Sequence, residues 1–287
     1  IDEKIIDIIE NYRPNLILLG HNNILSNKTL QIIKIKYQCK IALWYEDHLM
    51  KGDPHFLKNL TLIEKNNDLI DQYFVTTSPN IIKTKINKDK LNFLPIPVDP
   101  NIENGNYYNT QKTSDLFFAL SQGVNSGKLK KKFDNRANFI NELIDKNTNG
   151  LKFNLLGLYN EQPKWNHNFN SELMFAKTAL NLSRGGPSKY SSSNRIASIM
   201  GNGLLPFIHE EVMYQDFFDN DEIETYKDST DLIKKLELIK SNTKMLVLRS
   251  KNAKKRYFDI FSNNIVADFM IHKIFKNKNK YKHIWSN

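Results

Sequence analysis

Short, mostly apolar runs alternate along this chain with segments whose apolar residues recur at helical spacing. Runs at 16–19, 40–44, 72–76 and 91–94 have the length of buried strands, and residues 2–12 carry apolar side chains at helical spacing. Strands that alternate with helices favour a parallel sheet, because a crossover between parallel strands needs a connection of about a dozen residues or more. The sequence therefore predicts an α/β fold.

One segment interrupts this pattern. Pro95–Pro100 contains three prolines and is followed by the polar stretch 101–114, a composition typical of a linker. We therefore expect an N-terminal domain of residues 1–110, a C-terminal domain of residues 111–265, and a C-terminal helix and basic tail of residues 266–287. The chain opens at Ile1 inside a helix-like segment, so we also expect the N-terminal domain to be incomplete and to lack the first strand of a longer protein.

The second half repeats the α/β rhythm. Expected strands are 116–120, 153–156 and 179–182; expected helices are 136–144, one or more within 232–248, and 250–275 with a break near 262–264.

The net charge of +10, from 41 Lys and Arg against 31 Asp and Glu, admits three kinds of partner. These are nucleic acid, an anionic membrane surface and phosphorylated small molecules. The alternative is that lysine is abundant through compositional drift, in which case the positive charge has no functional meaning. No apolar run approaches the ~20 residues of a membrane span.

Cys39 is the only cysteine, so no internal disulfide can form. It lies in a strand-like run, where we expect an inert core thiol. This usage indicates the cytoplasm.

The segment Thr178–Leu232 contains the strongest functional signal. It predicts a strand, a glycine-rich loop, a short helix at 194–200, a glycine turn and a second strand. Glycines allow close backbone approach, arginine can grip a phosphate, and a helix start favours an anion. The alternative is a plain serine cap on a structural helix. The anion-binding candidates here are Ser183, Arg184, Gly185, Gly186, Tyr190, Ser192, Ser193, Asn194 and Arg195.

A second loop carries a weaker signal of the same kind. Gly123 and Lys128, with Arg136 further on, could also hold an anion, although the P-loop spacing is absent. The alternative is a mobile surface loop.

Candidates for a general base follow two predicted strands. Glu46, Asp47 and His48 follow one, and His21 follows another. A polar loop without a catalytic role is the alternative in each case.

Asp219 and Asp221 form an Asp-x-Asp pair within an acidic run, which favours a solvated loop. No His or Cys cluster has zinc spacing. We therefore expect no metal site.

The C-terminal tail combines aromatic residues with lysines. Phe275, Tyr281 and Trp285 are interleaved with the lysines between Lys273 and Lys282. This pattern suits an anionic membrane surface. The alternative, which the sequence favours, is a helix end followed by a disordered tail.

From about Leu91 onward the chain resembles GT-B glycosyltransferases, especially the CgeB-like, glycosyl transferases group 1 type. The family has a strand of the form LNxS, an Arg-Phe-Glu helix, an Ala-x-Gly turn, a second strand and a Tyr-x-Asp. The matching positions, in order, are Leu180–Ser183, Arg195, Gly203, the strand near Phe207, and Tyr226–Asp228; further matches are Phe117–Gly123 with Arg136, and Leu94–Asp99, which is similar to the LPxGVD segment closing the N-terminal domain.

The chain departs from the family at two positions. Ser198 occupies the place of the family glutamate that commonly holds the donor ribose, and Pro97 replaces the glycine of LPxGVD. The identity of the donor nucleotide therefore stays open, and a CMP-sugar is among the alternatives.

The resemblance implies two Rossmann-like domains facing across a cleft, with a nucleotide-sugar in the second domain and the acceptor in the first. The enzyme would move a sugar to a hydroxyl of a glycan, a lipid-linked acceptor or another cell-surface acceptor, without a metal and with no cofactor beyond the nucleotide-sugar co-substrate. Tyr226 joins the donor-binding candidates on this basis.

The expected setting is the cytoplasm, with peripheral contact at the inner face of an anionic membrane, in cell-surface polysaccharide biosynthesis. Inverting and retaining transfer both stay open. The alternatives are a non-catalytic nucleotide-sugar binding protein and a basic nucleic-acid-binding protein, although the lysines are spread out and no nucleic-acid module is present.

Overall fold

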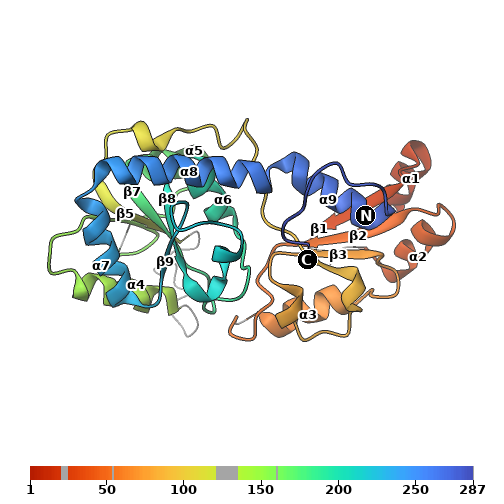
Figure 1. The fold of residues 1–287 in the computed structure, drawn as a ribbon. Coiled ribbons are helices and arrows are strands. Elements are labelled where there is room, and N and C mark those ends of the chain that lie inside the picture. The colour runs from red at the N-terminus through yellow and green to blue at the C-terminus, as the bar shows by residue number, and fades with distance from the viewer. Residues whose placement is uncertain (21–24, 54, 121–134, 160, 287) are drawn as a thin grey trace. The chain divides into compact units, whose positions relative to one another are not determined.

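The structure is a computed structural model that describes residues 1–20, 25–53, 55–120, 135–159 and 161–286. The chain divides into two compact units (Figure 1). Unit 1 comprises residues 1–95 and 264–287, and unit 2 comprises residues 96–263. The first boundary thus lies at residue 95 rather than near 110, and the C-terminal segment packs with the N-terminal part of the chain.

Unit 1 contains a parallel sheet in the order β1-β2-β3-β4. The strands are β1 (Leu16–Gly20), β2 (Lys40–Tyr45), β3 (Gln72–Val75) and β4 (Leu91–Phe93). The helices are α1 (Asp2–Tyr12), α2 (Asn27–Ile35), α3 (Phe56–Glu64) and α9 (Asn263–Phe275), with 3-10 turns at Pro79–Ile81 and Lys88–Lys90. The expected strands and the helix 2–12 are confirmed, and Ser26 caps α2 by accepting a hydrogen bond from the Thr29 N–H (3.1 Å).

Alternation along the strands of unit 1 produces two apolar faces. Ile41, Leu43 and Tyr45 of β2 lie in one core with side chains of α1, α2 and α3. On the opposite face, Phe74 of β3 packs edge-on against Phe269 of α9, with ring centroids 6.2 Å apart. The C-terminal helix therefore completes the core of the N-terminal unit.

The C-terminal tail is anchored to α9. The Asp268 carboxylate accepts hydrogen bonds from the backbone N–H groups of Lys280 (3.0 Å) and Tyr281 (3.2 Å). His283 and Trp285 are buried against the Phe269 ring. The disordered tail that the sequence favours is therefore wrong for residues 276–286, because aromatic burial and one carboxylate hold them.

Unit 2 contains a second parallel sheet, in the order β6-β5-β7-β8-β9. The strands are β5 (Ser114–Ala119), β6 (Phe153–Leu156), β7 (Ala176–Asn181), β8 (Leu205–His209) and β9 (Glu224–Tyr226). The helices are α4 (Asn135–Lys146), α5 (Asn166–Leu173), α6 (Asn194–Gly201), α7 (Ser229–Lys240) and α8 (Thr243–Phe261), with 3-10 turns at Tyr107–Asn109, Glu210–Val212 and Tyr214–Asp216.

Helices cover both faces of this sheet. Leu116 and Phe118 of β5 pack with α4 and α7, whereas Phe117 and Ala119 of the same strand pack with α5 and α6. Such double coverage explains why Leu116–Ala119 of β5 is a continuous apolar run. The expected break near 262–264 is confirmed, since α8 ends at Phe261 and α9 begins at Asn263.

Cys39 is buried and free, as expected, and burial raises the pKa of its thiol.

Within the described ranges, no helix combines the length and the apolar character needed to cross a bilayer.

Candidate functional site

The strand order of unit 2 reverses between β5 and β7. From β5 the chain moves outward to β6, then crosses back over β5 and continues through β7, β8 and β9. In open parallel sheets, ligands bind outside the carboxyl ends of the strands at such a switch point. Topology therefore places the candidate site of unit 2 beyond Ala119 of β5 and Asn181 of β7.

Arg195 lies at this switch point. Its Nη1 donates to the Leu182 carbonyl and its Nη2 donates to the Ala119 carbonyl, each at 3.0 Å. The guanidinium also lies 5.1 Å from the centroid of the Phe118 ring. Arg195 thus joins the carboxyl ends of β5 and β7 and puts a fixed positive charge between them.

The start of α6 is fixed to β7 beside that charge. The Ser193 hydroxyl accepts a hydrogen bond from the Ile196 N–H (3.4 Å) as the helix cap and donates to Asn181 Oδ1 (3.1 Å). Asn194, the first residue of α6, is exposed. The partial positive charge of the α6 N-terminus and the Arg195 guanidinium therefore reinforce each other at this edge.

The glycine-rich loop between β7 and α6 folds back on itself. Gly185 (φ 82°) and Gly186 (φ 101°) adopt left-handed backbone conformations that favour glycine, and the Gly186 N–H donates to the Ser183 carbonyl (3.4 Å). The Ser183 and Ser191 hydroxyls are hydrogen-bonded to each other at 3.0 Å. Arg184 is partly exposed on this loop.

Tyr190, further along the same loop, adopts a left-handed conformation (φ 59°). Its N–H donates to the Val212 carbonyl (2.8 Å), and its hydroxyl donates to Asp216 Oδ2 (2.6 Å). Burial, and then the Asp216 carboxylate, raise the pKa of the Tyr190 phenol to about 12. The ring packs on Phe217, so Tyr190 ties the loop to the segment after β8.

Two predicted donor residues have other surroundings. Ser192 is buried, and its hydroxyl accepts a hydrogen bond from the Ile96 N–H (2.9 Å). Tyr226 is fully buried between Phe139 and His209, and its hydroxyl has no partner among the described residues. The structure therefore places Tyr226 in the core of unit 2 rather than on its surface.

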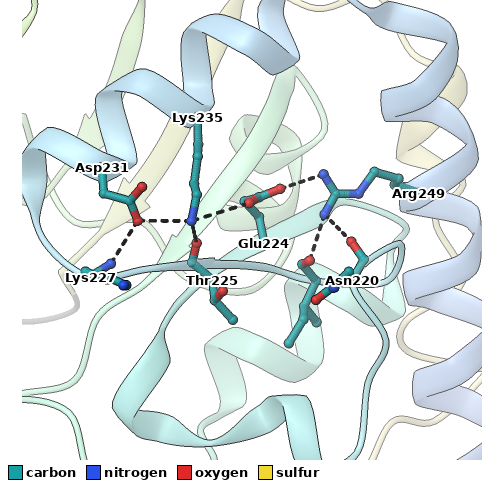
Figure 2. Close-up of polar contacts among 8 residues, drawn as sticks. Asn220, Glu224, Thr225, Lys227, Asp231, Lys235 and Arg249 are labelled. Atoms are coloured by element: carbon teal, nitrogen blue, oxygen red, sulfur yellow. Dashed lines mark hydrogen bonds and ion pairs between the residues drawn. The ribbon is translucent and has the colours of Figure 1, made fainter.

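Both members of the Tyr-x-Asp pair make structural contacts. Asp228 caps α7 by accepting a hydrogen bond from the Asp231 N–H (2.9 Å), while Tyr226 fills the core. Beside it, Figure 2 shows Glu224 between Arg249 and Lys235, at 2.6 Å and 3.8 Å. Arg249 also donates to the carbonyls of Asn220 and Ile223, so this network holds β9 to α7 and α8.

Of the other donor candidates, Arg136 lies near the start of α4 and is partly exposed. Gly123 and Lys128 lie outside the described residues, so the second loop carries no further conclusion.

At the carboxyl edge of unit 1, Glu46, Asp47 and His48 directly follow β2. Glu46 and Asp47 are exposed and His48 is partly buried. The Thr76 hydroxyl donates to the Glu46 carbonyl (3.0 Å), which ties this segment to the end of β3. His21 lies outside the described residues.

Sequence reasoning missed further polar residues at that edge. Thr77 and Ser78, directly after β3, are fully buried, and Asp53 is nearly so. Burial, and then the charges of Asp47 and Asp53, raise the pKa of the Tyr45 phenol. The signal was present in the sequence, because Thr76–Ser78 is a polar run immediately after an apolar strand.

The acidic run of unit 2 forms a small cluster. Carboxylate oxygens of Asp219, Asp221 and Glu222 lie within 4.8 Å of one another. The cluster has protein partners: Asn252 Nδ2 donates to Asp221 (2.7 Å), and the Asp219 N–H donates to Glu222 (2.9 Å). We assign no metal to it.

Residues 135–271 match the family described as glycosyl transferase-like. No curated protein sequence matches the chain.

Solved structures share its fold at low sequence identity. HepE of Anabaena in complex with UDP and glucose superposes with a TM-score of 0.61 at 11% identity, over 96% of this chain and 81% of that one. A glycosyltransferase from Rickettsia africae gives 0.58 at 13% identity over 96% and 81%. TarM gives 0.61 at 12% identity over 94% and 57%.

The two parallel α/β units and the similar solved structures identify the fold as that of GT-B glycosyltransferases, and the family match covers residues 135–271. These residues form the glycosyl transferase-like domain. The CgeB-like subtype stays a prediction.

Proposed function

We propose that unit 2 binds a nucleotide-sugar donor and that the enzyme transfers the sugar to a hydroxyl of a glycan, a lipid-linked acceptor or another cell-surface acceptor bound by unit 1. The observation that carries this proposal is Arg195 at the switch point, bonded to the ends of β5 and β7 beside the α6 N-terminus. The phosphate groups of such a donor are the anions that this edge suits.

The chemistry follows from the charges. The acceptor oxygen forms a bond to the anomeric carbon, the bond from that carbon to the phosphate oxygen breaks, and the nucleotide leaves with the electron pair. Arg195, with Arg184, Arg136 and backbone N–H groups of the 183–195 loop, stabilises the charge that develops on the phosphate. These groups supply the positive charge that a metal would otherwise supply, so we propose a metal-independent reaction.

If transfer inverts the anomeric centre, the acceptor proton needs a base. Glu46, Asp47 and His48 supply two carboxylates and an imidazole at the carboxyl edge of unit 1, and His21 follows the neighbouring strand. Proton transfer to a positioned side chain of this kind is general base catalysis.

The identity of the nucleotide is the part of the donor that the residues constrain least. Ser198 lies one turn after Arg195, and α6 carries no carboxylate to hold ribose hydroxyls. UDP is the first probe, because HepE structures contain UDP and UDP-glucose.

A thermal-shift panel of UDP, GDP, ADP and CMP sugars tests the donor site. A ligand that binds only the native state at about 100 times its Kd adds about 2.7 kcal/mol, which raises the Tm by about 5–10 °C for a unit of this size. We expect one base to stabilise selectively. Arg195→Ala should lose the shift, whereas Lys244→Ala, an exposed lysine on α8, should keep it. If no sugar nucleotide stabilises the wild type, the proposal is wrong.

We further propose a cytoplasmic enzyme of cell-surface polysaccharide biosynthesis that contacts an anionic membrane through its anchored tail. Lys276, Lys278, Lys280 and Lys282 are all exposed there, beside the exposed ring of Tyr281. Each lysine near an anionic surface contributes about 1 kcal/mol. Co-sedimentation with phosphatidylglycerol vesicles should be lost on replacing the four lysines by alanine, and absent with phosphatidylcholine vesicles. Equal binding of both proteins would contradict this contact.

A further inference from the structure

Ile96, the first residue of unit 2, has both of its backbone polar groups bound by side chains. Its N–H donates to the Ser192 hydroxyl and its carbonyl accepts from the Tyr257 hydroxyl, each at 2.9 Å. All three residues are buried. Because buried backbone groups need partners, these two hydroxyls fix the segment that enters unit 2.

The segment that leaves unit 2 is fixed to the same place. The Val98 N–H donates to the Phe261 carbonyl (3.0 Å), and the Asn263 N–H donates to the Val98 carbonyl (2.9 Å). The chain passes between the units at 95/96 and at 263/264. Both crossings are therefore bonded to each other within unit 2, and Ser192 and Tyr257 hold the first of them. We call residues 94–99 the linker.

Ser192 is also part of the 183–195 loop of the proposed donor site. Its neighbours bind two other segments: Ser191 is bonded to Ser183 within the loop, and Ser193 caps α6 and bonds Asn181 of β7. Three successive hydroxyls thus hold the loop, the linker and the helix start. A ligand that repositions the loop must move Ser192 relative to Ile96 or carry the linker with it.

We propose that Ser192 is a positioning residue, not a donor contact: its hydroxyl transmits the state of the donor loop to the linker that joins the two units. This rests on the proposed function, since the ligand that orders the loop is the nucleotide of the donor. Tyr257 holds the same residue from α8, outside the loop, through the Ile96 carbonyl, and its phenol also has a side-chain hydrogen bond with Ser192.

Amide hydrogen exchange of the full chain, with UDP as the probe, tests this. Pro95 and Pro97 carry no N–H, so Ile96 is the only exchangeable amide between them. In the wild type, UDP should slow exchange both in the 183–195 loop and at Ile96. In Ser192→Ala, Ile96 should exchange about tenfold faster without ligand. UDP should still protect the loop but no longer affect Ile96.

Tyr257→Phe is the matched control. It removes the other hydroxyl bonded to Ile96, so exchange should also be faster, yet UDP should still slow it. Ser192→Cys keeps the shape of the side chain with a weaker acceptor and serves if the alanine variant does not fold.

The outcomes separate the two proposals. If UDP protects neither the loop nor the linker, and GDP, ADP and CMP do not protect them either, the donor site itself is wrong. If UDP protects the loop but leaves Ile96 unchanged in the wild type, or still slows Ile96 in Ser192→Ala, the positioning role is overturned while the donor site stands.

Discussion

Both units contain a parallel sheet, but only in unit 2 does the order of the described strands reverse. The sheet of unit 1 follows chain order, β1-β2-β3-β4, whereas that of unit 2 switches direction between β5 and β7. Topology alone therefore indicates where the candidate ligand site of unit 2 lies. In unit 1 the assignment depends on which side chains follow the strands.

The chemistry of the two edges also differs. The edge of unit 2 gathers arginines and a helix N-terminus, which suit an anion. The edge of unit 1 gathers carboxylates and a histidine, which suit a proton. This difference suits the proposed glycosyl transfer, since the leaving group gains negative charge while the acceptor loses a proton.

The largest expected effect lies at the unit 1 edge. If transfer inverts, one of Glu46→Gln, Asp47→Asn or His48→Ala should lower turnover by about 10²–10⁴, because the acceptor loses its general base. Donor turnover at several pH values measures this. Asp68→Asn, an exposed carboxylate before β3, should have no effect. Wild-type rates in all three variants would remove this segment from the mechanism.

At the unit 2 edge, Arg195→Ala should lower turnover by about 10²–10³, the cost of losing one group that stabilises developing charge. Arg195→Lys keeps the charge but not the paired donors to Ala119 and Leu182, so it should recover only part of the loss. Circular dichroism confirms that the variants are folded. Full activity of a folded Arg195→Ala protein would contradict the assignment of the donor site.

Arg249 tests whether a partly buried arginine elsewhere in unit 2 behaves differently from Arg195. Its ion pair with Glu224 is mostly shielded, and Arg249→Ala should lower the free energy of unfolding by about 3 kcal/mol because Glu224 is left poorly compensated. UDP affinity of the folded protein should not change. Denaturant unfolding measures the loss, and Lys255→Ala, exposed on the same helix, should cause almost none. Lost UDP affinity would extend the donor site to β9.

The sequence predicted most of the strands because burial on both faces leaves short, mostly apolar runs. It did not predict α3 or α5. In α5, NHNFNSEL, only Leu173 is buried, and in α3 Leu57 is 74% exposed, so neither shows a clear apolar face.

The site was predicted in its location more than in its contacts. Arg195 and Ser193 lie at the expected edge because local order along the chain determines them. The attachment of Ser192 to Ile96, the burial of Tyr226 and the packing of α9 on β3 depend on partners far apart in the sequence. No local pattern contains that information.

The smallest expected effect is a loss of stability of unit 1 in mild acid, which arises from His283. His283 lies in the unit 1 tail with Nε2 3.1 Å from Asp268 Oδ2, and burial lowers its pKa although the Asp268 charge acts in the opposite direction. His272 and Lys273 lower it further. The unfolded chain takes up this proton near the ordinary value of about 6.5, while the folded chain takes it up only at lower pH. The unfolded state therefore binds more protons in that window, and stability present above about pH 6.5 is lost as the pH falls through the folded pKa.

Tail anchoring can be followed by the fluorescence of Trp285, whose ring centroid lies 5.6 Å from that of His283. Between pH 7 and 5 we expect the tail to loosen in the wild type and the response to disappear in His283→Gln. His167→Gln, an exposed histidine of unit 2, should leave the response unchanged. A tail that becomes more firmly anchored in acid would mean that the Asp268 charge outweighs burial, and unit 1 would then not be the acid-sensitive unit.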